Sequence, residues 1–438
     1  MTKSTNNQTE FIMNYRPRIA DKLLENKLKG MGAVLVEGAK WCGKTTTSEQ
    51  HAGSVLYMDN PKYRNSNIQM VKINPDYLLN GATPRLIDEW QIAPELWDAV
   101  RFAVDHRDED GQFILTGSVT PLSDEDDEKI HHSGAGRIAR LRMRPMTLWE
   151  SGDSSGEISL GALFQGAEEL FGSCNHELED IAWLMCRGGW PRAVNQSKDI
   201  ALGRAFDYYD TVVNVDVKEP DRVERNPERV KLLMRSYARN QGGQVSLGGI
   251  CADMKANDSD TLDDRTVYSY LRALRGIFVI EDTKAWNPNI RSKSAIRTSD
   301  TRYFTDPSIA VAALGVGPKD LMNDLNTMGL FFETMCMRDL RVYAQALDGD
   351  VYHYRDGDGL ECDAVIHLRN GSYGLVEIKL GGDSLIEEGV KSLQRLGKKI
   401  DTTKMKSPSF MMVLTAVGKY AYRRKDGVWL VPIGCLKN

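Results

Sequence analysis

The residues from Gly38 to Thr45 form the most specific chemical pattern in the chain. They read Gly-Ala-Lys-Trp-Cys-Gly-Lys-Thr and match the phosphate-binding motif G-x-x-x-x-G-K-[ST] in full. The glycines let backbone N–H groups wrap phosphates, Lys44 supplies a cation to the β- and γ-phosphates, and Thr45 offers its hydroxyl to Mg²⁺. A chance glycine-rich turn is the alternative. The motif predicts an ATP site made by Gly38, Ala39, Lys40, Trp41, Cys42, Gly43, Lys44, Thr45 and Thr46.

Two adjacent acids, Asp88 and Glu89, follow the short apolar segment 84–87. In a phosphate-transfer site the first acid holds the water shell of the metal, and the second orients and deprotonates the attacking water. Ordinary surface charge at a strand end is the alternative. After a complete phosphate-binding motif, the pair predicts a Mg²⁺ site made by Thr45 and Asp88, with Glu89 and Lys44 as catalytic residues.

Further candidates for the same site come later in the chain. Residues 112–118 read QFILTGS, and a strand there would end with Thr116 and Ser118. A hydroxyl at this end, with Ser118 as the candidate, would position the attacking water between the phosphate loop and Glu89. A turn with a capping serine is the alternative. Arg137 follows a Ser-Gly-Ala-Gly stretch and is the candidate arginine finger, acting in the same or a neighbouring subunit. The alternatives for that role are Arg140, Arg142 and Arg144.

A second group of charged residues lies near the C-terminus. Asn370 and Gly371 separate two alternating segments, 361–368 and 373–379, and both residue types tolerate a positive φ. The expected hairpin brings Asp363 close to Glu377. Strand alternation then places Glu377 and Lys379 on the same face.

Two acids and a lysine on one sheet face are typical of a metal-dependent nuclease, in which carboxylates bind Mg²⁺ and the lysine helps the nucleophile. The pattern resembles the restriction-endonuclease-like superfamily, in which a preceding helix often adds another acid. Glu333 stands in that place. The resemblance predicts a metal site made by Glu333, Asp363 and Glu377, with Lys379 beside it. Binding of nucleic acid or a partner without cleavage is the alternative.

The elements that position the first site are expected in residues 32–150. Short apolar strands alternate there with amphipathic segments, which is typical of an α/β unit with a parallel sheet. The acidic residues 124–128 are interpreted as a solvated loop and the small residues 151–159 as a linker. The expected strands are 33–37, 54–58, 85–88 and 112–116.

The middle of the chain is predominantly helical. Helices expected over 244–257 and 263–276, followed by a strand over 278–282, have the order of a winged helix. The second helix would bury Val267, Leu271 and Leu274 and present Arg265, Ser269, Arg272 and Arg275 to DNA. The next segment would form a basic wing against the single acid Asp300, with Lys284, Arg291, Lys293, Arg297 and Arg302. A protein-binding spacer is the alternative.

Composition limits the class of protein. With 438 residues, 41% hydrophobic and 27% charged, the chain is an ordinary globular protein of several domains. We expect it to be cytoplasmic, because no apolar segment has the ~18–20 residues of a membrane helix. The formal net charge of −5 provides no general attraction for nucleic acid. The scattered cysteines suit a reducing compartment: Cys42, Cys174, Cys186, Cys251, Cys336, Cys362 and Cys435.

From Tyr15 to Leu380 the chain resembles the bacterial and archaeal AAA+-type ATPases that join a P-loop domain to a C-terminal domain of uncharacterised function. The resemblance implies ATP hydrolysis more firmly than any biological role. The motifs that carry it are YRPR at 15–18, VEGAKWCGKTT at 36–46, LIDEWQ at 86–91, FILTGS at 113–118, Gly136-Arg137, RGGWP at 187–191 and YFTDP at 303–307.

We therefore expect an α/β protein with an AAA+-type P-loop sheet domain, a helical and winged-helix middle region, and a restriction-endonuclease-like α/β domain. The expected boundaries are 1–150, 151–225, 226–315 and 316–438. The predicted function is ATP hydrolysis coupled to a C-terminal module that binds DNA or is nuclease-like, with ATP and Mg²⁺ as cofactors and a possible homo-oligomer. The alternatives are a nucleotide-gated protein-interaction switch without DNA activity and an ATP-dependent, metal-requiring DNA nuclease.

Overall fold

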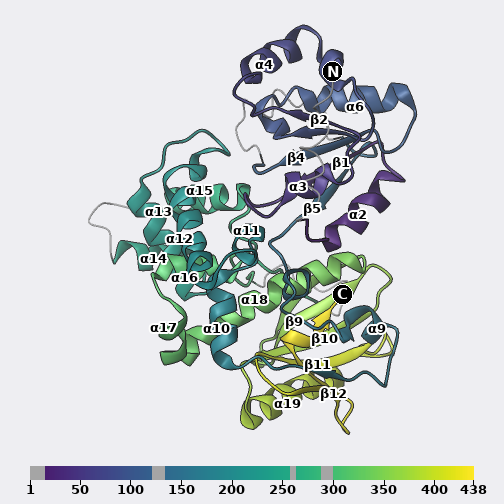
Figure 1. Cartoon of the computed structure of the whole chain (residues 1–438). Helices are drawn as coiled ribbons and strands as arrows, with labels where there is room; N and C mark the ends of the chain where they lie inside the picture. Colours follow the sequence, from purple (N-terminus) through teal and green to yellow (C-terminus); the bar gives the residue numbers. More distant parts are fainter. Residues whose placement is uncertain (1–14, 121–133, 257–262, 288–298) are drawn as a thin grey trace. The chain divides into compact units, whose positions relative to one another are not determined.

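The computed structural model describes residues 15–120, 134–256, 263–287 and 299–438 (Figure 1). It divides the chain into two compact units, Met1–Met143 and Arg144–Asn438, and each is described by itself. The acidic residues 124–128 and three of the predicted wing residues, Arg291, Lys293 and Arg297, lie outside the described residues. No helix within these ranges is long and apolar enough to cross a membrane.

The first unit is built on five parallel strands in the spatial order β2-β3-β4-β1-β5. This order inserts β4 between β1 and β3, so the ends of those three strands meet at one edge of the sheet. The strands are β1 (Ala33–Glu37), β2 (Ser54–Tyr57), β3 (Arg85–Asp88), β4 (Phe113–Gly117) and β5 (Ile138–Arg142).

Both faces of this sheet are covered, as the continuous apolar residues of β1 require. On one face, Ala33 and Leu35 pack with Phe113 and Leu115 against Trp97 of α6. Figure 1 shows α2 and α3 on the other face. The helices of the unit are α2 (Ile19–Leu28), α3 (Lys44–Glu49), α4 (Arg64–Ile73), α5 (Pro75–Leu79), the 3₁₀ turn η1 (Trp90–Ile92) and α6 (Leu96–Arg107).

The second unit contains a mixed sheet of seven strands in the order β7-β12-β13-β11-β10-β9-β8. Helix α19 (Asp383–Lys399) packs on it through Val390, Leu393 and Leu396. The strands are β7 (Gly172–Ser173), β8 (Gly349–Arg355), β9 (Glu361–Leu368), β10 (Tyr373–Lys379), β11 (Phe410–Thr415), β12 (Tyr420–Arg423) and β13 (Trp429–Pro432).

Most of the other elements described in the second unit are helices. Small elements join them, namely α8 (Leu148–Ser151), α9 (Leu160–Phe164), α11 (Pro191–Val194) and α17 (Pro318–Asn323). The longer helices are α10 (Leu178–Arg187), α12 (Lys198–Asn214), α13 (Pro227–Arg239), α14 (Leu247–Lys255), α15 (Asp264–Gly276), α16 (Pro307–Leu314) and α18 (Leu325–Ala346).

The region predicted to be a winged helix contains α14 and α15, close to their expected positions. The strand predicted over 278–282 is wrong in extent, because only isolated bridges form there, between Ile280 and Phe304 and between Thr283 and Thr301. Phe278, with a φ of 63°, bends the backbone where the strand would begin. The winged helix itself stays a prediction.

The interpretation of residues 151–159 as a linker is wrong. Ser154 Oγ donates to the carbonyl of Leu436 at 2.8 Å, and β6 (Ile158–Ser159) pairs in parallel with β14 (Leu436–Lys437). Further along, β7 adds to the edge of the seven-stranded sheet. Residues 154–173 therefore belong with the last strands of the chain.

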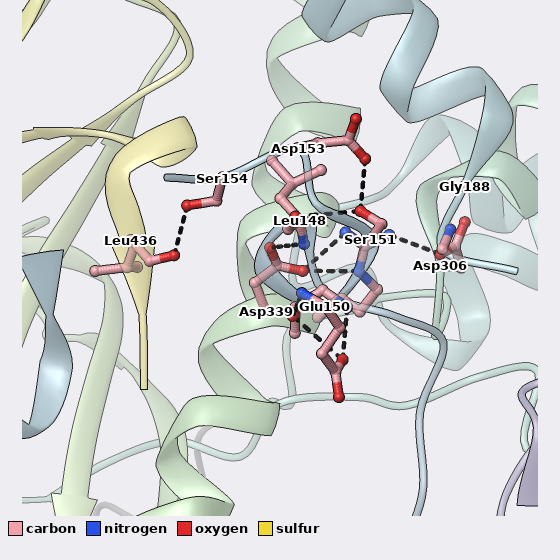
Figure 2. Close-up of polar contacts among 12 residues, drawn as sticks. Leu148, Glu150, Ser151, Asp153, Ser154, Gly188, Asp306, Asp339 and Leu436 are labelled. Atoms are coloured by element: carbon pink, nitrogen blue, oxygen red, sulfur yellow. Dashed lines mark hydrogen bonds and ion pairs between the residues drawn. The ribbon is translucent and has the colours of Figure 1, made fainter. Parts of the chain in front are cut away.

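The glycines of the RGGWP motif allow a close approach between chain segments. A Cβ on Gly188 would lie 2.4 Å from Asp306 Oδ1, and one on Gly189 would lie 2.1 Å from the Met146 carbonyl oxygen. Both contacts are too short for any side chain. Figure 2 shows Gly188 and Asp306 near the helical turn of Leu148, Glu150 and Ser151.

A fully buried ionic group lies in the same place. Arg338 of α18 donates to Asp306 Oδ2 at 2.9 Å and to Asp339 Oδ1 at 2.8 Å, and no side chain of the three is more than 1% exposed. The backbone N–H of Leu148 donates to Asp339 Oδ2 at 2.9 Å. Burial raises the pKa of Asp339 to about 6 although Arg338 opposes the shift. These hydrogen bonds connect α18 with Asp306 at the N-terminus of α16 and with Leu148 near the beginning of the second unit.

Candidate functional site

The phosphate-binding motif forms the loop between β1 and α3. Gly43 precedes the first helical residue with a φ of 100°, a conformation that favours glycine. A Cβ on Gly38 would lie 2.0 Å from the carbonyl oxygen of Met143, which follows β5. The two glycines of the motif are therefore required by the backbone, and α3 directs its N-terminal N–H groups toward the loop.

The ammonium of Lys44 is buried inside its own loop. Lys44 Nζ donates to the carbonyl oxygens of Gly38 at 2.9 Å and Ala39 at 3.0 Å. The carbonyl oxygens of the loop therefore accept the hydrogen bonds of the ammonium that the sequence predicts to bind phosphates. Two of the three N–H donors of the ammonium are thus used inside the loop.

Asp88 is the last residue of β3, and it lies at the edge of the sheet where β1, β3 and β4 end. Thr45 Oγ1 donates to Asp88 Oδ1 at 2.7 Å, and Thr116 Oγ1 donates to the same oxygen at 2.6 Å. Burial raises the pKa of Asp88, while the two hydroxyls oppose that shift. A hydroxyl and a carboxylate in direct contact are hard oxygen donors, which suit Mg²⁺. The residues present fit the predicted metal.

Glu89 is held beside Asp88 by neighbours from β4 and from the turn that follows β3. Ser118 Oγ donates to Glu89 Oε2 at 2.9 Å, and Thr116 Oγ1 accepts from the Glu89 backbone N–H at 3.1 Å. Gln91 Nε2 also donates to Glu89 Oε2. The structure thus brings together Thr45, Asp88, Glu89 and Ser118, because β4 lies between β1 and β3.

The segment before α2 contacts the same loop, which sequence reasoning did not assign to the site. Arg18, 6% exposed, donates from Nη1 to the Cys42 carbonyl at 2.8 Å. The hydroxyl of Tyr15 lies 3.0 Å from Thr47 Oγ1 in α3. The YRPR motif was the available signal, but its contact with the loop depends on tertiary packing.

Arg137 lies far from the phosphate loop of its own chain. It directly precedes β5, whose first residue Ile138 is opposite Ala33, whereas the loop follows Glu37 at the other end of β1. Five residues of strand span about 15 Å. Its guanidinium binds Asp105 at 2.7 Å instead. A finger acting within one chain is therefore wrong for Arg137, and a role in a neighbouring subunit stays a prediction.

The alternative arginines are also engaged. Arg140 pairs with Glu37 at 2.9 Å. Arg142, at the loop end of β5, is opposite Glu37 in the strand register. Arg144 belongs to the second unit, where it donates to both carboxylate oxygens of Glu281, at 2.9 and 2.7 Å.

The predicted C-terminal hairpin forms between β9 and β10, with Gly371 at a φ of 81°. Asp363 and Glu377 both approach Lys379, whose Nζ lies 2.8 Å from Glu377 Oε2 and 3.6 Å from Asp363 Oδ2. The backbone N–H of Ile378 donates to Asp363 Oδ2 at 2.7 Å. The two acids and the lysine therefore share one face, as expected from strand alternation.

Glu333 of α18 lies near this group and accepts a hydrogen bond from the Tyr303 hydroxyl. Burial and the Asp363 charge raise the pKa of Glu333 to about 8, and the same causes raise the pKa of Glu377 to about 8. Among the described residues, no three His, Cys, Asp or Glu side chains are arranged to hold a metal ion. Lys379 lies between Asp363 and Glu377, and the three-carboxylate metal site stays a prediction.

Much of the predicted DNA-binding face of α15 is occupied by internal contacts. Ser269 Oγ accepts from Arg225 at 3.1 Å. Arg275 and Arg302 both bind Asp282, at 2.6 and 2.8 Å. The expectation that these groups would be presented to DNA is wrong. Three of the remaining basic residues in the described part of this region are exposed: Arg265, Arg272 and Lys284.

Three protein-family models match separate parts of the chain. Residues 31–151 match an AAA domain, AAA_14. Residues 178–320 and 328–436 match two domains of unknown function, DUF8612 and DUF4143.

Two curated relatives are uncharacterised proteins, Rv2008c of Mycobacterium tuberculosis and Mb2031c of Mycobacterium bovis. Each is 24% identical over 387 residues, covering 86% of this chain and 76% of the relative. Among solved structures, the Walker-type ATPase PABY2304 of Pyrococcus abyssi matches with 15% identity and a TM-score of 0.42, covering 72% of this chain and 98% of that one. The ADP form of the ORC2 protein of Aeropyrum pernix matches with 13% identity and a TM-score of 0.32, covering 75% and 99%.

The family match spans β1 to β5 and includes the phosphate-binding loop, so this part of the chain is an AAA-type P-loop ATPase domain. The chain thus carries an AAA-type P-loop ATPase domain at residues 31–151 and a DUF4143 domain at residues 328–436.

Proposed function

We propose that the chain hydrolyses ATP with Mg²⁺ and couples the nucleotide state to a nucleic-acid-binding module in its second unit. The observation that carries the catalytic part is the position of Asp88, which accepts from Thr45 and Thr116 while the next residue, Glu89, is held by Ser118. Thr45 and Asp88 would hold Mg²⁺, which when bound neutralises charge on the phosphates. Lys44 would bind the β- and γ-phosphates, and Glu89 would take a proton from the attacking water.

The nucleic-acid part of the proposal rests on the exposed basic residues Arg265, Arg272 and Lys284. Cationic groups on one module bind phosphate backbones without sequence preference. The test is ATP turnover by the purified protein with and without single-stranded DNA, duplex DNA and RNA. We expect at least one of them to raise turnover, with a dependence on salt. A rate that none of them changes would favour the protein-interaction switch, in which Arg275 and Arg302 serve only internal contacts.

The Lys44→Ala variant is expected to bind ATP about 10–100-fold more weakly than the native protein. The reason is the loss of a charged hydrogen-bond donor to phosphate, which contributes about 1.5–3 kcal/mol. Titration with a fluorescent ATP analogue measures the change. Lys29→Ala, which removes an exposed lysine of the same unit, is the matched control and should bind normally. Native affinity in Lys44→Ala would exclude this lysine from the phosphate site.

A second candidate function is metal-dependent cleavage of DNA, favoured by Asp363, Glu377 and Lys379 on one sheet face. Cleavage would need a divalent cation to displace Lys379 Nζ from the two carboxylates. Native protein and Asp363→Ala are compared on nicked, branched and linear DNA with Mg²⁺ or Mn²⁺. Asp350→Ala, which changes an exposed acid of β8, is the control. Cleavage lost only in Asp363→Ala would support the nuclease, and no cleavage by the native protein would exclude it.

A further inference from the structure

The backbone turns sharply at Glu89. Glu89 has a φ of 55°, a left-handed conformation that is uncommon for residues other than glycine. The 3₁₀ turn η1 follows directly, and Ile92 N–H donates back to the Glu89 carbonyl at 3.1 Å. Trp90, 4% exposed, anchors the turn in the core against Trp97 at a ring separation of 5.1 Å. This turn returns the side chain of Gln91 to Glu89.

The amide of Gln91 contacts both polar neighbours at the end of β3. Its Nε2 donates to Glu89 Oε2 and lies 3.5 Å from Ser118 Oγ. Ser118 Oγ donates to the same Glu89 oxygen at 2.9 Å. Two donors thus hold one carboxylate oxygen, which leaves Oε1 of Glu89 as the oxygen that can act on water.

The amide oxygen of Gln91 accepts no hydrogen bond from the described residues. Gln91 Oε1 is buried and has no hydrogen-bond partner among the residues that the structure describes. It lies against β4, where a Cβ on Gly117 would be 3.3 Å away. A buried acceptor without a donor is unfavourable, and a hydrogen bond from a small donor such as water would satisfy it.

We propose that Gln91 is a positioning residue for ATP hydrolysis: its N–H, with the hydroxyl of Ser118, holds Glu89 Oε2, and its Oε1 accepts a hydrogen of the attacking water. This inference rests on the proposed function of Glu89 as the base. In the reaction, the water oxygen bonds to the γ-phosphorus as the bond to the β,γ-bridging oxygen breaks. One water proton goes to Glu89 Oε1, and ADP leaves with the electron pair of the broken bond.

The Gln91→Ala variant is expected to lower kcat about 10-fold, because misplacing a catalytic group by about 1 Å has effects of up to ~10². Its KM for ATP should stay within about twofold, since Gln91 acts on the reaction and not on phosphate binding. The test repeats the substitution in a Glu89→Gln background. There Gln91→Ala should have a clearly smaller effect, because the base that it positions is absent and only its contact with the water is lost.

Two more variants separate positioning from a structural role. Gln91→Glu replaces the amide donor by a carboxylate, which cannot donate to Glu89 Oε2 and places a like charge beside it, so kcat should fall at least as much as in Gln91→Ala. Gln91→Met has similar length without polar atoms and replaces the alanine variant if that variant fails to fold, as judged by Tm. Gln69→Ala, an exposed glutamine of α4, is the control.

The outcomes distinguish this inference from the proposed function. An equal loss of kcat from Gln91→Ala in native and Glu89→Gln backgrounds would overturn positioning through Glu89. Native kcat in Gln91→Ala and Gln91→Met, alongside an inactive Glu89→Gln, would overturn the inference and leave the proposed function intact. Absence of ATP hydrolysis by the native protein would overturn both.

Discussion

The Glu89→Gln variant should bind ATP with native affinity and hydrolyse it at least about 100-fold more slowly, the lower range for losing a general base. The substitution keeps the size of the side chain and its contact with Ser118, so the site should remain assembled. It removes the carboxylate that takes the proton of water. Phosphate release under saturating ATP measures the rate, and titration with an ATP analogue measures affinity.

The control for this prediction is Glu109→Gln, which neutralises an exposed acid of the same unit. It should hydrolyse ATP at the native rate. Hydrolysis by Glu89→Gln at that same rate would show that another group takes the proton. Loss of ATP binding in Glu89→Gln would instead show that Glu89 organises the site.

The Arg338→Met variant is expected to lower the free energy of unfolding by about 3–5 kcal/mol, the usual cost of removing one partner of a buried ion pair. Asp306 and Asp339 would be left buried without their counter-charge. Urea unfolding followed by circular dichroism measures the change. Arg355→Met is the matched control, because Arg355 pairs with Glu361 on the surface, where both side chains are about half exposed. An exposed pair of this kind contributes about 0–1 kcal/mol.

A second change tests the cause of that loss. Adding Asp306→Asn and Asp339→Asn to Arg338→Met removes both uncompensated charges and should recover part of the lost stability. If Arg338→Met unfolds at the same urea concentration as Arg355→Met, the buried ionic group does not stabilise the second unit.

The nucleotide loop was predictable because its residues are contiguous. Gly38 to Thr45 form one local motif, and the strand before it and the helix after it follow from apolar periodicity alone. Asp88 and Glu89 were predictable for the same reason, since they directly follow a short buried strand. The hydrogen bonds from Thr45 and Thr116 to Asp88 depend only on the order of neighbouring parallel strands.

Features that depend on segments far apart in sequence were not predictable. Residues 151–159 look like a linker because they are small and polar, yet Ile158 and Ser159 pair with Leu436 and Lys437 at the end of the chain. The position of Arg137 depends on which end of β5 adjoins the start of β1. The contact of Gln91 with Glu89 could not be predicted from its residue type, because it depends on the backbone turn at Glu89, which has a positive φ.

The C-terminal group shows the limit of pattern matching for charged residues. The hairpin, the facing acids and the position of Lys379 follow from turn chemistry and strand alternation. A lysine beside two carboxylates can assist a bound metal ion or take its place. Which of the two occurs depends on the distances between the ammonium and the carboxylate oxygens, and the spacing of the residues in the sequence does not determine these distances. Here Lys379 Nζ lies 2.8 Å from Glu377 Oε2 and 3.6 Å from Asp363 Oδ2.

The hydrogen bonds of Lys44 with its own loop have a consequence for ATP affinity. If Lys44 binds the phosphates as proposed, its ammonium must leave the carbonyls of Gly38 and Ala39 before all of its donors can reach phosphate oxygens. The apparent Kd for ATP is the intrinsic Kd divided by the population of that competent state. A substitution that shifts the population changes the affinity without touching ATP, so the nucleotide-free ensemble of the loop is itself a determinant of how much ATP the protein needs.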